Sequence, residues 1–255
     1  MNRLQKTLQQ DKKLLSIYFT AGYPNLNNTV SIIQELEKNG VDFIEIGLPF
    51  SDPLADGPTI QTSSTHALKN GMNTALLFDQ LKDIRKTVQI PLIIMGYFNP
   101  ILQYGVEEFC KKCQEIGIDA LILPDLPLEE YNTLYKATFE KYNLSNIFLI
   151  TPQTSTKRIK EIDSSSSAFI YMVSSASTTG TQNDFSAKQT DYFERISKLK
   201  LKNPQIVGFG ISNYETFLST ISYAKGAIIG SAFIKMISKE GIAGISSFIK
   251  SIRNS

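Results

Sequence analysis

Eight short runs of β-branched, aromatic and other apolar residues recur at fairly even intervals along the chain, and a segment with helical periodicity follows each run. Alternation of this kind predicts parallel strands joined by right-handed helical crossovers. Eight such units in 255 residues favour closure of the sheet, because α/β barrels commonly use about 250 residues as one domain. We therefore predict a single (β/α)8 TIM barrel over residues 1–255, with strands at 15–20, 43–47, 92–96, 120–123, 147–151, 169–173, 206–209 and 227–229.

An open, doubly wound sheet is the alternative architecture for the same alternation. Its dinucleotide-binding signature is glycine-rich, and the only similar string, Gly208-Phe209-Gly210, lacks the third glycine and comes late in the chain. The barrel is therefore the better interpretation. Helix signals at 27–39 and 128–142 agree with it, and residues 1–10 are expected to form an extra N-terminal helix that caps the N-terminal end of the barrel.

The charge balance gives no broad electrostatic footprint for nucleic acid or a membrane surface. The 26 basic and 24 acidic residues are spread along the chain, for a net charge of +2. The first thirteen residues contain no apolar signal core, and the longest apolar stretches are far shorter than the ~20 residues of a membrane span. We expect a cytoplasmic protein that binds a small molecule.

The cysteine and histidine content argues against a metal site. Cys110 and Cys113 form a CxxC motif, but they belong to an apolar helical stripe with Phe109 and Ile116, and no second pair accompanies them. The single histidine, His66, falls outside the apolar face of its helix. We predict no metal and no Ser-His-Asp hydrolase.

The second predicted strand carries a carboxylate on its inner face. Period-two alternation puts Phe43, Glu45 and Gly47 on one face, and Ile44 and Ile46 suit the helix-packed outside. No other predicted strand offers a lysine or arginine at an inward position to pair with Glu45, so a functional role is favoured over a structural ion pair. Burial should raise the pKa of this carboxyl, as suits a group that gives and takes a proton near neutral pH.

The loop after this strand, SDPLADGP, contains two further carboxylates, Asp52 and Asp56. Its two prolines and glycine restrict the backbone, a composition that positions side chains but also makes ordinary turns. Asp56 lies further out along the loop, where it can reach over the barrel mouth, and spacing favours it slightly over Asp52.

Glycine-rich strand ends predict a phosphate site. The string GFGIS at 208–212 and Gly230-Ser231 each end a predicted strand and are expected to open a helix, so both can present free backbone N–H groups to an anion. Thr179-Gly180, in the polar loop 174–189, can close over the same phosphate. Tyr171 alternates inward and is a candidate substrate contact, although an inward aromatic is often simply core.

Several strings together resemble the α subunit of tryptophan synthase over essentially the whole chain. They are FTAGYP at 19–24, EIGLPFSDPLADGPTIQ at 45–61, PDLP at 124–127, GFGIS at 208–212 and GSAFIK at 230–235. The resemblance implies a lyase that cleaves indole-3-glycerol phosphate into indole and glyceraldehyde 3-phosphate by a retro-aldol step, without a metal or organic cofactor.

The resemblance also implies roles for individual residues. Glu45 would be the general acid/base, and Asp56 would hold the indole N–H and stabilise the charge that develops on the ring. The phosphate would be held by Gly180, Gly210, Gly230 and Ser231. The indole and glycerol pocket would be lined or supported by Tyr18, Ile60, Tyr97, Asp125, Tyr171, Thr179 and Phe209.

The resemblance further implies a partner, a pyridoxal-phosphate (PLP) β subunit in an αββα complex, with the Asp56 loop and residues 99–105 near the contact. One departure bears on this partner. Many members of the family carry an arginine and a glycine before the Thr-Gly pair, whereas this chain has SSASTTG at 174–180. Loss of a long cationic side chain puts in doubt how the loop communicates with the partner.

Three other functions would require different residues or a loss of chemistry. A pentose-phosphate epimerase needs metal ligands that a chain with one histidine does not readily supply. A synthase that makes indole-glycerol phosphate is expected to use a strand lysine, and no predicted strand contains one. A non-catalytic partner of the β subunit is disfavoured by the presence of both Glu45 and Asp56, and a free-standing lyase remains open.

Overall fold

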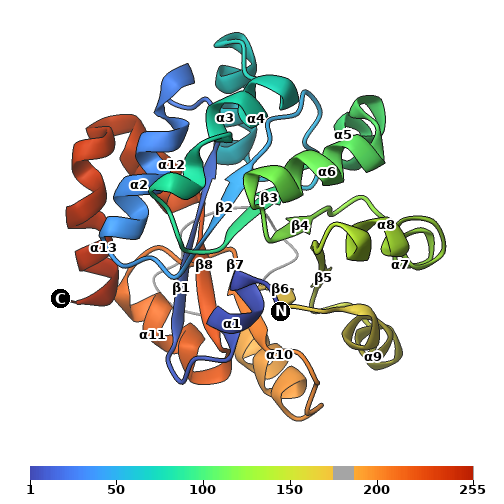
Figure 1. The fold of residues 1–255 in the computed structure, drawn as a ribbon. Helices are drawn as coiled ribbons and strands as arrows, with labels where there is room; N and C mark the ends of the chain where they lie inside the picture. Colours follow the sequence, from blue (N-terminus) through green and yellow to red (C-terminus); the bar gives the residue numbers. More distant parts are fainter. Residues whose placement is uncertain (175–186, 255) are drawn as a thin grey trace.

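The strands close into one parallel barrel, as the sequence predicts. In the computed structural model, which describes residues 1–174 and 187–254, eight parallel strands of the described chain pair in sequence order and β8 pairs back onto β1. Figure 1 shows the strands surrounded by a ring of helices. The strands are β1 (Leu14–Thr20), β2 (Phe43–Gly47), β3 (Leu92–Met95), β4 (Ala120–Ile122), β5 (Ser145–Ile150), β6 (Ile170–Val173), β7 (Gln205–Gly208) and β8 (Gly226–Ile229).

The strand ends differ from prediction by one or two residues, with one local cause at β7. Phe209, expected to be the last residue of that strand, has a φ of +70°, in the left-handed region that extended strands do not use. Strand β5 begins two residues earlier than expected, at Ser145. Ser145 and Asn146 are polar, so the apolar pattern left them out, but both are buried in the strand.

Side chains alternate between the barrel interior and the layer under the helices. The interior cluster contains Tyr18 of β1, Phe43 of β2 and Tyr171 of β6, whereas Ile44 and Ile46 pack outward against the helices. The parity that places Phe43 inside also places Glu45 inside, as predicted.

The helices cover the outside of the barrel. Within residues 1–174 and 187–254, three crossovers contain two α-helices each: β2 to β3, β3 to β4 and β4 to β5. The long predicted helix at 128–142 is interrupted by a π-helical turn, Tyr131–Tyr135. The α-helices are α1 (Arg3–Leu8), α2 (Thr29–Lys38), α3 (Pro58–Lys69), α4 (Thr74–Leu81), α5 (Phe98–Tyr104), α6 (Val106–Ile116), α7 (Leu128–Glu130), α8 (Lys136–Lys141), α9 (Thr156–Ser165), α10 (Ala187–Ser197), α11 (Tyr214–Tyr223), α12 (Ser231–Glu240) and α13 (Ile245–Arg253).

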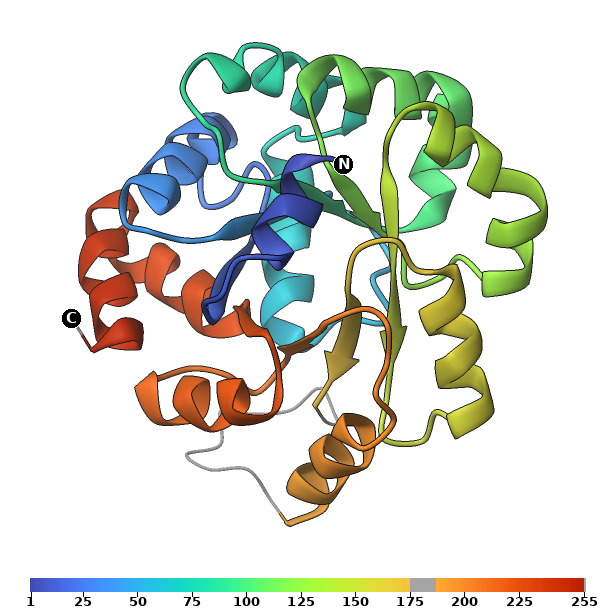
Figure 2. The ribbon, with the colours of Figure 1, turned by 60° about the horizontal axis from the view of Figure 1, so that its bottom comes forward.

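Helix α1 caps the N-terminal end of the barrel, which confirms the prediction for residues 1–10. Leu4 and Leu8 are buried in the interior cluster, and the Asn2 amide donates to the Asp119 carbonyl at 2.8 Å, just before β4. Figure 2 shows the same placement of α1 in a turned view.

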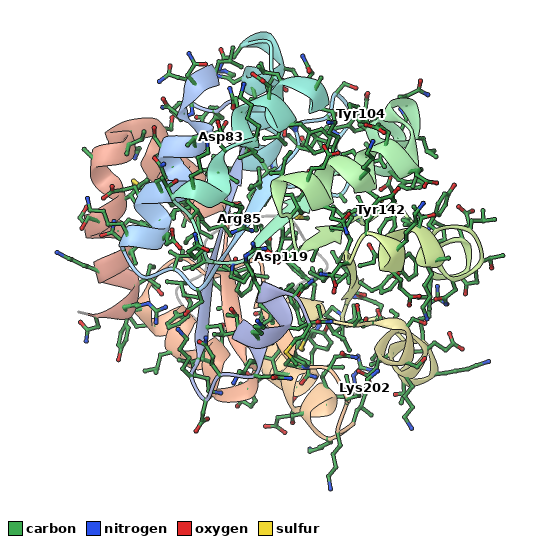
Figure 3. The ribbon with its side chains drawn as sticks, viewed as in Figure 1. Asp83, Arg85, Tyr104, Asp119, Tyr142 and Lys202 are labelled. Atoms are coloured by element: carbon green, nitrogen blue, oxygen red, sulfur yellow. The ribbon has the colours of Figure 1, made fainter. Side chains whose placement is uncertain are left out.

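A buried ion pair joins elements at this end of the barrel. Arg85 and Asp119 lie close together beside α1 in Figure 3, with 2.9 Å between guanidinium nitrogen and carboxylate oxygen. Arg85 also donates to the carbonyls of Gly117, Val88 and Ile90. An ion pair with hydrogen bonds at the N-terminal face of a barrel serves stability, whereas catalysis belongs to the opposite end.

The two cysteines and the single histidine lie where the sequence predicts them. Cys110 and Cys113 are free thiols buried on α6, and His66 is exposed on α3. Within residues 1–174 and 187–254, no three or more histidine, cysteine, aspartate or glutamate side chains form a group that could hold a metal ion. No helix in the described part of the chain is long and apolar enough to cross a membrane.

Candidate active site

Glu45 is a fully buried carboxyl group inside the barrel. It lies on β2 directly across from Tyr18 of β1, and neither of its side-chain oxygens has a hydrogen-bond partner among the described residues. Burial raises the pKa of Glu45 from 4.5 to about 8. An unpaired buried carboxyl costs folding free energy, so its presence indicates a function that needs a proton held at neutral pH.

The loop after β2 brings a second carboxyl group to the barrel mouth. Asp56 is half-buried, whereas Asp52 is exposed. The Tyr97 hydroxyl, at the end of β3, accepts from the Ala55 N–H at 2.8 Å and donates to Asp56 Oδ2 at 3.4 Å. Burial raises the pKa of Asp56 to about 6, and the Tyr97 hydrogen bond opposes that rise. The structure thus distinguishes the two aspartates, since only Asp56 is held toward the interior.

Two buried tyrosines, Tyr18 and Tyr171, need glycines beside them. A Cβ at Gly47 would lie 2.2 Å from the Tyr18 hydroxyl, and one at Gly208 would lie 2.0 Å from the Tyr171 hydroxyl. Burial raises the pKa of both phenols, and the nearby Asp56 and Glu45 carboxylates raise them further. Both phenols are therefore within electrostatic reach of both carboxyl groups.

A cavity opens at the mouth next to these groups. Three of the predicted residues, Tyr18, Asp56 and Tyr97, border it, and the Tyr97 ring stacks on Phe50 with 5.0 Å between centroids. The sequence did not single out the other lining residues, because most are apolar side chains or prolines near strand ends, which look like core or turn, and Ser64 lies on α3. These are Leu48, Phe50, Pro53, Ser64, Met95, Gly96 and Pro124.

The remaining predicted pocket residues are spread between the interior and the rim. Ile60 of α3 is buried in the interior cluster, and the half-buried Phe209 packs its ring against Tyr171 at 6.2 Å. Asp125 is exposed, and both its oxygens accept from the Phe98 N–H at 2.9 and 3.0 Å. This aspartate therefore supports the start of α5.

The two predicted phosphate loops differ in the structure. Gly230 precedes α12, whose N-terminus has no side-chain cap, so Ser231 begins a helix with free N–H donors, as expected. The prediction that GFGIS opens a helix is wrong, because α11 begins only at Tyr214 and the Asn213 side chain caps it. Gly210 lies instead in an exposed turn with a φ of +76°. Thr179 and Gly180 lie outside the described residues.

A closed (β/α)8 barrel with a buried carboxyl inside and a second carboxyl on the loop above defines an acid–base enzyme. The family model of the tryptophan synthase alpha chain matches residues 4–252. The tryptophan synthase alpha chains of Flavobacterium johnsoniae and Flavobacterium psychrophilum are 71% and 69% identical to this chain, covering 99% of it and 100% of each relative. The chain belongs to the tryptophan synthase alpha chain family.

Solved structures agree with this assignment. Tryptophan synthase subunit alpha from Legionella pneumophila has a TM-score of 0.90 at 34% identity, covering 100% of this chain and 98% of that one. A structure of Mycobacterium tuberculosis tryptophan synthase gives a TM-score of 0.90 at 28% identity, covering 99% and 97%.

Proposed function

We propose that this chain, acting as one catalytic domain, cleaves indole-3-glycerol phosphate to indole and glyceraldehyde 3-phosphate in L-tryptophan biosynthesis, with Glu45 as general acid/base and Asp56 as the electrostatic partner. Membership of the tryptophan synthase alpha chain family supports the reaction. The observation that carries the residue assignment is the fully buried Glu45 carboxyl, which has no hydrogen-bond partner within residues 1–174 and 187–254.

The two pKa values suit two different roles. With a pKa of about 8, Glu45 is mostly protonated at pH 7 and can give a proton to the ring carbon that carries the glycerol side chain. With a pKa of about 6, Asp56 is mostly ionised and can hold the indole N–H. Environments that separate the pKa values of two carboxyl groups in this way distinguish a proton donor from a carboxylate that stays ionised.

The proposed retro-aldol step balances without a cofactor. Protonation of the ring carbon makes the indole an iminium-like electron sink, and the Asp56 carboxylate compensates its positive charge. Glu45, now ionised, accepts the proton of the adjacent glycerol hydroxyl. The electrons of the breaking carbon–carbon bond return to the ring, releasing indole, and the former hydroxyl carbon becomes the aldehyde of glyceraldehyde 3-phosphate.

The phosphate would bind across the rim from these carboxyl groups. The uncapped N-terminus of α12, with Gly230 and Ser231, supplies backbone N–H donors and the positive end of a helix dipole. Gly210 would approach the anion from the neighbouring loop, and Gly180 with Thr179 would complete the site. The pocket itself would be lined by Tyr18, Ile60, Tyr97, Tyr171 and Phe209, with Asp125 in support.

We further propose that the chain works in the cytoplasm with a tryptophan synthase β subunit, in an αββα complex where PLP belongs to the β chain. Leu54 of the Asp56 loop is 89% exposed and Leu102 of α5 is 46% exposed, an apolar character that suits a partner surface. Both lie in the segments that the resemblance to the family puts near the contact. The SSASTTG sequence at 174–180, which lacks the cationic side chain of many relatives, should weaken or alter the coupling to the β subunit.

The test is indole release from indole-3-glycerol phosphate in metal-free buffer, with and without the cognate β subunit. Glu45→Gln and Asp56→Asn should each lower kcat by at least ~10², the usual contribution of positioned acid–base groups, while the β subunit still binds. Asp52→Asn, on the same loop but exposed, is the matched control and should retain wild-type turnover. Fast release without a partner would indicate a free-standing lyase, and no release in either condition would overturn the proposal.

A further inference from the structure

A buried serine links the end of β6 to the turn after β7. Ser174 directly follows β6 and is 0% exposed, and its hydroxyl group donates to the Phe209 carbonyl at 2.6 Å. The Ser174 N–H donates to the Gly208 carbonyl at 3.2 Å, which extends the pairing of β6 with β7 by one residue. Two successive carbonyl groups, those of Gly208 and Phe209, therefore point toward the same neighbouring strand.

The backbone leaves the extended conformation at Phe209. In a regular strand, successive carbonyl groups point to opposite sides. Phe209 has a φ of +70°, in the left-handed region that a side chain disfavours, and Gly210 follows with a φ of +76°. The hydrogen bond from the Ser174 hydroxyl stabilises the Phe209 carbonyl in this reversed direction.

The direction of the Phe209 carbonyl fixes the direction of the Gly210 N–H. The peptide bond between these residues is trans, and in a planar trans peptide the C=O and N–H groups point in opposite directions. Strand β7 lies between β6 and β8. The Gly210 N–H therefore points away from β6, to the side of β8 and the uncapped N-terminus of α12. It has no acceptor within residues 1–174 and 187–254.

We propose that Ser174 is a positioning residue that aims the Gly210 N–H at the phosphate group of the substrate. The proposal rests on the proposed function, because it assigns how that same phosphate site is held. Without the Ser174 hydroxyl, the peptide between Phe209 and Gly210 can rotate back toward the extended conformation that Phe209 prefers. The Gly210 N–H then turns away from the anion, and a charge-assisted hydrogen bond that was oriented in advance is lost.

The first test compares kcat and KM of wild type and Ser174→Ala for indole-3-glycerol phosphate, on the full chain with its β subunit. Ser174→Ala should raise KM about tenfold, the size of one hydrogen bond to a charged group. It should leave kcat within about twofold of wild type, because the phosphate is bound equally in the ground state and the transition state.

Ser166→Ala is the matched control for this substitution. Ser166 is 2% exposed and precedes β6, at the opposite end of the barrel from Ser174. Its hydroxyl group has no hydrogen-bond partner in the described part of the chain. Ser166→Ala should therefore keep the wild-type KM.

The second test removes the phosphate from the ligand. For indole glycerol, which has no phosphate group, Ser174→Ala should match the kcat/KM of wild type, because the residue acts only through the anion. In calorimetric titrations with glycerol 3-phosphate, Ser174→Ala should bind about tenfold more weakly than wild type. The titration does not depend on turnover.

A purely structural role for Ser174 would give a different pattern. Wild-type KM in Ser174→Ala, an equal loss of kcat/KM with indole glycerol, or unchanged affinity for glycerol 3-phosphate would each overturn the proposal. Should Ser174→Ala not fold by circular dichroism, Ser174→Cys makes the same test, because a thiol is a weaker donor. Absence of indole release by the wild-type chain would instead refute the proposed function, and the glycerol 3-phosphate titration would still decide the role of Ser174.

Discussion

Replacing Glu45 by glutamine should stabilise the folded protein, by an amount that grows with pH. The Glu45 carboxyl is fully buried, and its pKa rises from 4.5 to about 8 on folding. Between these two values the unfolded chain releases a proton that the folded chain retains. The wild-type protein therefore loses stability as the pH rises through this window, and a side chain that cannot ionise does not.

The magnitude follows from the width of the window. Each pH unit inside it costs about 1.4 kcal/mol, so the penalty should reach about 3 kcal/mol at pH 7. Glutamine has a buried amide at every pH, which shifts its stability by a constant and leaves the slope unaffected.

The assay is urea unfolding of wild type and Glu45→Gln at pH 5, 6 and 7. The gap between the two proteins should widen by about 1.4 kcal/mol per pH unit. Glu130→Gln, at an exposed position on α7, is the control and should follow wild type. Parallel curves for wild type and Glu45→Gln would refute the reasoning, because they would mean that the carboxyl ionises equally in both states.

Three further outcomes follow from the structure. The pH profile of kcat/KM should be bell-shaped, with limbs near the pKa of about 6 for Asp56 and about 8 for Glu45, because the first must be ionised and the second protonated; a profile without the upper limb would contradict the assignment. Arg85→Ala should lower the free energy of unfolding by about 3 kcal/mol, since three carbonyl groups and the buried Asp119 carboxylate each lose a donor. Arg85→Lys should not restore it in urea titrations, and equal stability of the lysine variant and wild type would count against the argument. Gly47→Ala should lower kcat/KM by at least ~10-fold with the circular dichroism spectrum retained, because its Cβ would lie 2.2 Å from the Tyr18 hydroxyl, and unchanged turnover would show that this packing is unimportant.

The barrel and its buried acid were predictable because both depend on local periodicity. Alternation of strands and helices indicated closure, and parity along β2 placed Glu45 beside Phe43 on the inner face. The choice between Asp52 and Asp56 was only a slight preference, because both fit turn chemistry. The structure separates the two aspartates, because Tyr97, from the loop after β3, holds the Asp56 loop.

The start of α11 was mispredicted for a local reason. The glycines of GFGIS suggested a helix N-terminus, but Asn213 is the better cap, since its side chain accepts from the Thr216 N–H at 2.9 Å. The uncapped terminus lies at Gly230 instead. The spacing of Asn213 and Thr216, a capping residue followed three positions later by a polar one, would have identified this helix start from the sequence.

The sequence by itself determined which strand faces are apolar and that Glu45 points inward, because side chains alternate between the two faces of any strand. It also determined that no strand offers an inward lysine or arginine to pair with Glu45. Only the tertiary structure decided which groups meet. Closure of the barrel brings Tyr97 of the third βα loop onto Asp56 of the second, and seats α3 so that Ser63 reaches Thr20. These contacts span 41 and 43 residues and depend on strand register and helix packing, which no local pattern specifies.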